Sequence, residues 1–294
     1  MISIIISTVN ESLRRAIEKN IEATVGIQHE IVFIDNSDGS RGLCEVYNIG
    51  AKQASFNVLC FMHEDVQIKT DDWGKIVLKH FATDDSLGLL GVVGSTYKSS
   101  VFSGWGPYGS PTRIDYANII QGYRFKDSPD SHYYHNPDNS SLKEVAALDG
   151  VWLCSKREII LKHPFDQDTF KRFHCYDLDI SLSIGKHYKV AVTFDILMKH
   201  FSEGRFEEEW AEATMLLHKK WKDQLPVNKA GFNSKGVIFC EKRTFRKILP
   251  FLFECGYSLK QVLEVLNYSK VWSLSPVLYI KLYLSALRVG ILSK

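Results

Sequence analysis

Apolar runs alternate with amphipathic runs over the first 65 residues. The runs of strand length cover residues 2–8 (ISIIIST), 30–37 (EIVFIDNS) and 56–65 (FNVLCFMHED). Between them, residues 11–23 carry Leu13, Ile17 and Ile21 four apart with charges in between, which predicts an amphipathic helix. A second helix is predicted over 42–54. This order of elements predicts an α/β fold with a doubly wound, mostly parallel sheet and right-handed crossovers.

The rest of the chain is less regular. Residues 87–97 predict one strand, and the Gly-, Pro-, Asn- and Ser-rich stretch 99–143 predicts a long loop, which in a compact domain is often functional. The later elements are predicted as a strand and helix over 144–160, a helix over 175–188, a strand over 189–201, a helix over 207–225, and helices over 240–294 with a break near Pro276. We therefore expect two domains, 1–220 and a helical extension over 221–294.

Polar residues follow each of the first three strands. They are Thr8, Asn10 and Glu11, then Asp35, Asn36 and Ser37, then His63, Glu64 and Asp65. In doubly wound sheets, ligands bind at the carboxyl ends of the strands. Asp65 is either a ligand of a divalent cation that neutralises a pyrophosphate, or a turn former before the next helix.

Two acids and a histidine are further candidates. Asp177 and Asp179 are two residues apart on a predicted helix, so they point in different directions and do not form a dyad. Either one of them is a general base, or both simply complement the helix N-terminus. His200 ends a predicted strand. A lone histidine is usually structural, and His200 becomes a functional candidate only if the fold brings it near Asp65.

Charge and cysteine content narrow the function classes. The net charge of +2 conceals a basic segment, because residues 240–294 hold nine Lys/Arg and three Glu while the rest of the chain is acidic. An acidic body argues against a nucleic-acid partner. None of the six cysteines forms a C-x-x-C pair, which predicts free thiols and a cytoplasmic protein. The first apolar run lacks a basic flank and predicts a strand, so no signal peptide is expected.

Four segments in order resemble the motifs of family 2-like glycosyltransferases of the GT-A fold. They are STVNES (7–12), FIDNSDGS (33–40), YNIGAKQASFNVLCFMHEDV (47–66) and HPFDQDTFKRFHCYDLDISL (163–182). The variant motifs are closest to a bacterial subgroup of glycosyltransferase-like proteins. Three positions depart from the family pattern. Ser55 stands where the family usually has Gly, His63 replaces the first acid of the D-x-D motif, and Tyr176 replaces the Glu before Asp177.

The resemblance implies a metal-dependent glycosyltransferase. Asp65 and His200 would hold Mn²⁺ or Mg²⁺, and Asp177 would be the base of an inverting transfer from a nucleotide sugar, with UDP favoured, to a hydroxyl acceptor. The donor would contact residues at or near the strand ends. They are Thr8, Asn10, Glu11, Asp35, Asn36, His63, Glu64 and Asp149. Acceptor-side candidates are Trp105, Trp152 and Asp179, where each Trp either stacks on a sugar or packs in the core.

Several alternatives stay open. The chain is either an enzyme of cell-surface polysaccharide or glycan synthesis, or a degenerate nucleotide-sugar-binding protein whose His63 marks lost turnover. A nucleotidyltransferase is disfavoured, because the first strand is not followed by a Gly-rich phosphate loop. Residues 271–294 form a basic apolar helix that either contacts the inner face of the cell membrane near a lipid-linked acceptor, packs on the domain, or pairs with a second subunit of a homo-oligomer.

Overall fold

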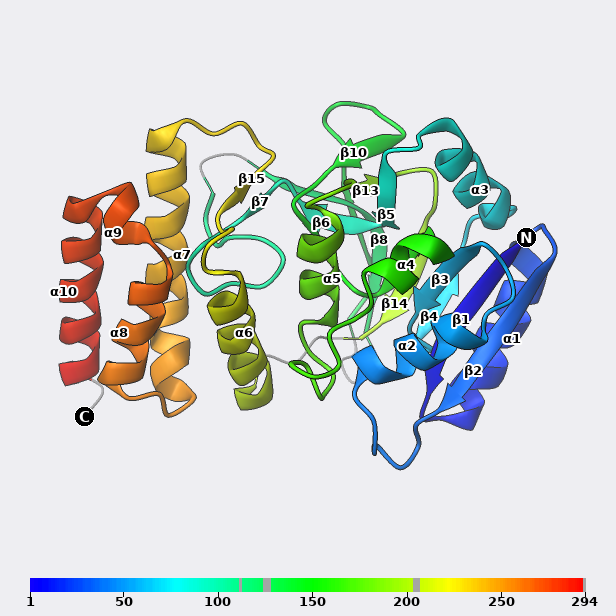
Figure 1. Ribbon diagram of the computed structural model, residues 1–294, viewed down its shortest axis with the longest axis horizontal. Helices are drawn as coiled ribbons and strands as arrows, with labels where there is room; N and C mark the ends of the chain where they lie inside the picture. Colours follow the sequence, from blue (N-terminus) through cyan, green and yellow to red (C-terminus); the bar gives the residue numbers. More distant parts are fainter. Residues whose placement is uncertain (111–112, 124–127, 203–206, 293–294) are drawn as a thin grey trace. The chain divides into compact units, whose positions relative to one another are not determined.

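The computed structural model describes residues 1–110, 113–123, 128–202 and 207–292 (Figure 1). Its strands are β1 (Ile2–Thr8), β2 (His29–Asp35), β3 (Val58–Met62), β4 (Val66–Ile68), β5 (Leu87–Gly91), β6 (Val93–Ser95), β7 (Tyr97–Lys98), β8 (Asp115–Gly122), β9 (Ser131–His135), β10 (Leu142–Glu144), β11 (Ala147–Leu148), β12 (Trp152–Lys156), β13 (Lys189–Thr193), β14 (Met198–Phe201) and β15 (Val227–Asn228). Its helices are α1 (Glu11–Thr24), α2 (Leu43–Gln53), α3 (Trp73–Thr83), α4 (Arg157–Lys162), α5 (Tyr176–Ile184), α6 (Glu208–Trp221), α7 (Ser234–Glu254), α8 (Leu259–Tyr268), α9 (Val271–Leu274) and α10 (Pro276–Leu292).

The described chain divides into two compact units. The first comprises residues 1–94 and 116–204, and the second comprises residues 95–115 and 205–294. Helix α6 and the segment 95–115 thus pack with the C-terminal helices, whereas the sequence places them before the expected limit at residue 220. The limits of the two expected domains, 1–220 and 221–294, stay a prediction.

The main sheet of the first unit has the strand order β10-β13-β5-β12-β3-β1-β2. Strands β2, β1 and β3 are parallel, as are β5 and β13, while β12 and β10 run antiparallel to their neighbours. The chain moves from β1 outward to β2 and then back past β1 to β3. With right-handed crossovers, this reversal puts α1 and α2 on opposite faces of the sheet. The expected doubly wound α/β fold is confirmed.

A second sheet in this region has the order β11-β6-β8-β14-β4, with β9 paired to β8. Its hairpin β8–β9 falls inside the stretch 99–143 that the sequence predicts as a loop. The prediction is wrong there because a mostly buried strand segment, DYANIIQG, lies between Gly- and Pro-rich flanks and has no clear alternating pattern. The single strand predicted over 87–97 is also broken into β5, β6 and β7, and the one over 189–201 into β13 and β14.

The second unit is a helical layer with its own core. Helices α7, α8 and α10 pack together through apolar residues such as Phe245, Leu252, Leu266 and Leu282. Pro276 opens α10 in the first-turn position where a missing N–H costs nothing. Among the described residues, no helix is both long and apolar enough to cross a membrane. None of the six cysteines, all of them among the described residues, forms a disulfide, and five of them are buried, as predicted.

Candidate active site

Strand register brings the polar strand ends to one edge of the main sheet. In the parallel pairs, Thr8 is opposite Asp35, and Ile6 is opposite Met62, the last residue of β3. Strand β12 runs the other way and starts with Trp152 opposite Met62, so the loop before it reaches the same edge. The candidates after β1, β2 and β3 therefore share an edge with Asp149 and Gly150.

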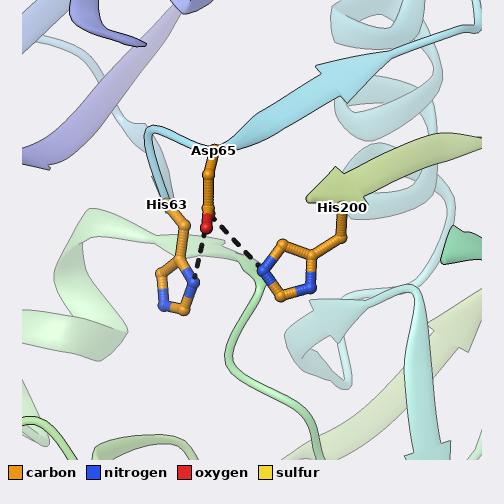
Figure 2. Close-up of side chains that lie close together, drawn as sticks. All are labelled: His63, Asp65 and His200. Carbon is orange, nitrogen blue, oxygen red and sulfur yellow. Dashed lines mark ion pairs between the residues drawn. The ribbon is translucent and has the colours of Figure 1, made fainter. Parts of the chain in front are cut away.

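A second register places His200 beside Asp65. Strand β14 pairs antiparallel with β4 so that His200 is opposite Val66, and the backbone N–H of Phe201 donates to the carbonyl of Asp65 at 3.0 Å. The Oδ1 atom of Asp65 lies 3.4 Å from Nε2 of His200 and 3.9 Å from Nδ1 of His63. Figure 2 shows all three side chains pointing toward one another.

The chemistry of this cluster fits a divalent metal ion. One ligand atom from each of His63, Asp65 and His200 lies within 4.8 Å of the others. The Nε2 atom of His200 is buried and makes no hydrogen bond among the described residues. Burial, followed by the nearby His200, lowers the pKa of His63 to about 4, so its imidazole is neutral and keeps a lone pair for a metal. Two imidazoles and one carboxylate suit Mn²⁺ better than Mg²⁺.

Tyr176 and Asp177 both form hydrogen bonds with the backbone of Gly150, one with its carbonyl and one with its N–H. Both residues lie in the first turn of α5, which starts after Cys175 in the left-handed conformation (φ 68°). The Tyr176 hydroxyl donates to the Gly150 carbonyl at 3.0 Å, and the Gly150 N–H donates to Oδ2 of Asp177 at 3.1 Å. A Cβ atom on Gly150 would lie 2.1 Å from the Tyr176 hydroxyl oxygen, so only glycine fits.

Asp177 has the electrostatics of a proton acceptor. Burial, and then the negative charge of Asp149, raise its pKa to about 7, against the opposing effect of nearby backbone N–H groups. A carboxylate with a pKa near neutrality is suited to general-base chemistry. Asp179, in contrast, is 2% exposed and turned into the packed side of α5.

Two of the strand-end residues, Asn10 and Glu64, accept hydrogen bonds from backbone N–H groups. Asn10 caps α1 by accepting from the N–H groups of Ser12 and Leu13, at 2.9 and 3.2 Å. Glu64 is buried and accepts from the backbone N–H groups of Val9 and Asn10. These contacts hold the ends of β1 and β3 together at the edge where the metal-ligating atoms gather.

The residues after β2 make a turn. Asp35 accepts from the N–H of Ser37 at 3.0 Å, and this hydrogen bond lowers the pKa of its carboxyl. Asn36 exchanges hydrogen bonds with the backbone of Arg41 at both ends of its amide. The side chain of Asp35 stays exposed, while that of Asn36 is occupied by the turn.

Glu11 and Thr8 differ in their surroundings. Glu11 is exposed and pairs with Arg14 and Arg15 on its own helix. Thr8 is buried at the end of β1. These surroundings do not show which ligand Glu11 or Thr8 would bind, so both residues stay predicted donor contacts.

The two tryptophans lie in different places. Trp152 is fully buried and packs edge-on against Trp73, with ring centroids 6.1 Å apart, so the core-packing alternative describes it. Trp105 is half-buried in segment 95–115, which belongs to the second unit.

The sequence did not indicate where three residues lie. The donor contact expected of His63 stays a prediction, and the structure places His63 among the candidate metal ligands. Tyr176 contacts both His63 and Gly150, and Gly150 contacts Asp177. The signal available for His63 was its place in the sequence, two residues before Asp65 in the segment that resembles the D-x-D motif.

The sequence and the fold are similar to those of known glycosyltransferases. A family model described as "Glycosyltransferase like family" matches residues 3–223. The structure of GalNAc-T7 with UDP, GalNAc and Mn²⁺ aligns at TM-score 0.52 and 12% identity over 95% of this chain. The structure of residues 1–349 of S. aureus TarS aligns at TM-score 0.54 and 13% identity, over 94% of this chain and 82% of that one. This chain spans 57% of the GalNAc-T7 chain. No curated protein matches the sequence.

Proposed function

Because the chain belongs to the glycosyltransferase-like family and has the GT-A fold, we propose that it transfers a sugar from a nucleotide sugar to a hydroxyl acceptor in a metal-dependent reaction. One observation carries the proposal. The same edge of the sheet holds a cluster of metal-ligating atoms and a carboxyl group whose pKa is raised to about 7. An inverting, metal-dependent transfer from a nucleoside diphosphate would use both kinds of group.

The donor diphosphate would bind at the His63–Asp65–His200 cluster. A divalent ion held there supplies positive charge to a diphosphate as negative charge develops on it. Thr8, Asn10, Asp35 and their neighbours at the ends of β1 and β2 would contact the nucleotide, with Asp35 the best placed to accept a hydrogen bond because its carboxylate is exposed. The GalNAc-T7 structure contains UDP and Mn²⁺, which supports UDP as the nucleotide and Mn²⁺ as the ion.

Asp177 would act as the base. As the acceptor hydroxyl attacks the anomeric carbon, the bond from that carbon to the diphosphate oxygen breaks, and the hydroxyl proton moves to the Asp177 carboxylate. One of its oxygens accepts from Gly150, which orients the group. A single displacement of this kind inverts the anomeric configuration, which analysis of the product by NMR would reveal. Asp149 would line the donor sugar from the loop before β12.

The direct test is release of UDP from a panel of UDP-sugars by the full chain, with Mn²⁺ and with EDTA, in the absence of acceptor. We expect slow hydrolysis of one or a few donors that EDTA abolishes. Asp65→Asn should lose it, whereas the matched change Asp168→Asn on an exposed carboxyl should not. Binding of a donor without turnover under any condition would favour the degenerate nucleotide-sugar-binding alternative.

For the acceptor, we propose a glycan or lipid-linked hydroxyl at an anionic membrane surface, in polysaccharide synthesis at the cytoplasmic face. Helix α10 supports this proposal. It exposes Val277, Ile280, Leu284 and Ile291, and the exposed cations Lys281 and Arg288 lie among them. No acidic residue follows Glu264 in the sequence, so this face is complementary to anionic lipid.

Vesicle co-sedimentation tests the membrane contact. The chain should bind vesicles that contain phosphatidylglycerol and should bind phosphatidylcholine vesicles far less. Leu284→Asp should abolish binding, whereas Leu161→Asp, at an exposed leucine of the first unit, should not. If Leu284→Asp instead separates a dimer and vesicle binding is absent throughout, the face joins two copies of the chain and the membrane proposal is wrong.

A further inference from the structure

We infer that Tyr176 makes His63 a third metal ligand by fixing which of its ring nitrogens carries the proton. The inference rests on the proposed metal-dependent function and assigns a positioning residue to it. Tyr176 and His63 both depart from the resembled motifs, and they are in direct contact. The Tyr176 hydroxyl oxygen lies 2.6 Å from Nε2 of His63.

The proton count at the Tyr176 hydroxyl decides the tautomer. A phenol has one proton, and this one is donated to the Gly150 carbonyl at 3.0 Å. The hydroxyl can therefore only accept from His63, so Nε2 of His63 must carry a hydrogen. The opposite orientation would set two oxygen lone pairs against each other at Gly150. In a neutral ring, a protonated Nε2 leaves Nδ1 with the lone pair.

That lone pair faces the other ligand atoms. Nδ1 of His63 lies 3.9 Å from Oδ1 of Asp65, and the His63 and His200 rings are 5.8 Å apart between centroids (Figure 2). A metal-ligating histidine commonly donates its other ring N–H to a fixed acceptor, which orients the ring. The Tyr176 hydroxyl is that acceptor here.

The hydroxyl is held rigidly. Tyr176 is 4% exposed, and its ring packs edge-on against Tyr47 at 5.5 Å between centroids. Gly150 leaves no space between its backbone and the hydroxyl, as the 2.1 Å approach of a Cβ atom shows. The resulting set of two imidazoles and one carboxylate should select Mn²⁺, Co²⁺ or Zn²⁺ over Mg²⁺.

Tyr47 provides a matched control. Its ring is fully buried in the same aromatic cluster, and its hydroxyl has no hydrogen-bond partner among the described residues. Tyr176→Phe and Tyr47→Phe each delete one buried hydroxyl and keep the ring. A purely structural role of Tyr176 would change stability without changing the His63 tautomer or metal preference.

The experiment combines two measurements on the full chain. In the metal-free protein, histidine ¹⁵N NMR should show His63 protonated at Nε2, and this preference should be lost in Tyr176→Phe only. Calorimetric titration with Mn²⁺, alone and with UDP, should show affinity falling about 10- to 100-fold in Tyr176→Phe, and unchanged in Tyr47→Phe. His63→Ala should lose as much as Tyr176→Phe, and the double variant no more.

The outcomes separate the inference from the proposed function. If the wild type binds Mn²⁺ and Tyr176→Phe binds it equally well, the inference is wrong and the metal-dependent transferase still stands. A His63 ring protonated at Nδ1 in the metal-free wild type overturns the inference in the same way. If the wild type binds no Mn²⁺ with or without UDP, both are wrong.

Discussion

Asp177 in the first unit and Glu241 in the second are both carboxylates on helices, α5 and α7, and their surroundings differ. Glu241 is fully buried on α7 and accepts hydrogen bonds from the hydroxyl of Tyr97 and from Ser99, Ser100 and Val101. Its two oxygens are surrounded by donors that tie residues 97–101 to the helix. A buried carboxylate with this many partners is a structural anchor.

Asp177 is half-buried, and a second carboxylate, Asp149, lies close enough to raise its pKa. Backbone N–H groups hold it in place but do not offset burial and the like charge. The comparison teaches that burial alone does not mark a reactive carboxyl. A reactive carboxyl is one whose charge is poorly compensated, so that taking up a proton is favourable near neutral pH.

The largest effect is expected for Asp177→Asn. Loss of a general base typically costs about 10²- to 10⁴-fold in rate, while the Asn carbonyl can still accept from the Gly150 N–H and keep the loop in place. We expect kcat to fall by that factor with the affinity for Mn²⁺ unchanged. Steady-state kinetics and calorimetry measure the two quantities, and Asp168→Asn is the exposed control. An Asp177→Asn enzyme with the full rate would place the base elsewhere.

Glu241→Gln should act on stability instead. The amide turns one acceptor oxygen into an NH₂ donor that faces hydroxyl and N–H groups, and unsatisfied buried donors are costly, so we expect a loss of roughly 3 kcal/mol in the free energy of unfolding. Urea denaturation followed by circular dichroism measures it. Glu254→Gln, on an exposed face of the same helix, is the control and should change little. Unchanged stability of Glu241→Gln would show that these hydrogen bonds do not anchor the segment.

The pH dependence of the rate and of the stability should report the ionisation of Asp177. Since Asp177 must be ionised to accept a proton, kcat/KM should fall as pH drops below about 7, close to tenfold for each unit. Its folded pKa is raised above the unfolded value, so the protonated group favours the folded state at low pH and this stabilisation is lost as pH rises through about 7.

Melting temperatures of the metal-free protein check that sign. Asp177→Asn should melt higher than the wild type at pH 8, where the wild-type carboxyl is charged, and this advantage should shrink as the pH falls through 5 toward 4. A variant that melts lower at pH 8 would contradict the raised pKa.

The smallest effect is expected at Asn10, whose side chain satisfies backbone donors. Asn10→Ala removes the cap of α1 and should cost about 1 kcal/mol of stability, whereas Asn10→Ser should retain most of it. Urea denaturation again gives the measurement. A loss much larger than this would mean that Asn10 holds more than the helix end.

Much of the first unit follows from local sequence patterns. Short continuous apolar runs predict β1 to β3, and the amphipathic segments between them predict α1 and α2. The parallel order of these strands brings Thr8, Asp35 and Asp65 to one edge. The resemblance adds His200, whose pairing through β14 and β4 the spacing of the chain alone does not reveal.

What escaped prediction depends on contacts between residues far apart in the chain. His63 and Tyr176 are 113 residues apart and meet only because β12 inserts next to β3 and α5 follows it. The Glu241 anchor joins residues 97–101 across about 140 residues, which is why segment 95–115 belongs to the second unit. The full burial of Trp152 reflects packing against Trp73, which no local pattern shows.

The central claim is that a nucleoside diphosphate and a divalent ion share the site formed by His63, Asp65 and His200. The measurement that tests it most directly is the melting temperature of the full chain with UDP, with Mn²⁺ and with both together. Because ligands that bind the native state stabilise it, we predict a shift with both that exceeds the sum of the separate shifts and disappears in Asp65→Asn. An equal shift by UDP in the presence of EDTA, or an unchanged joint shift in Asp65→Asn, would contradict the account.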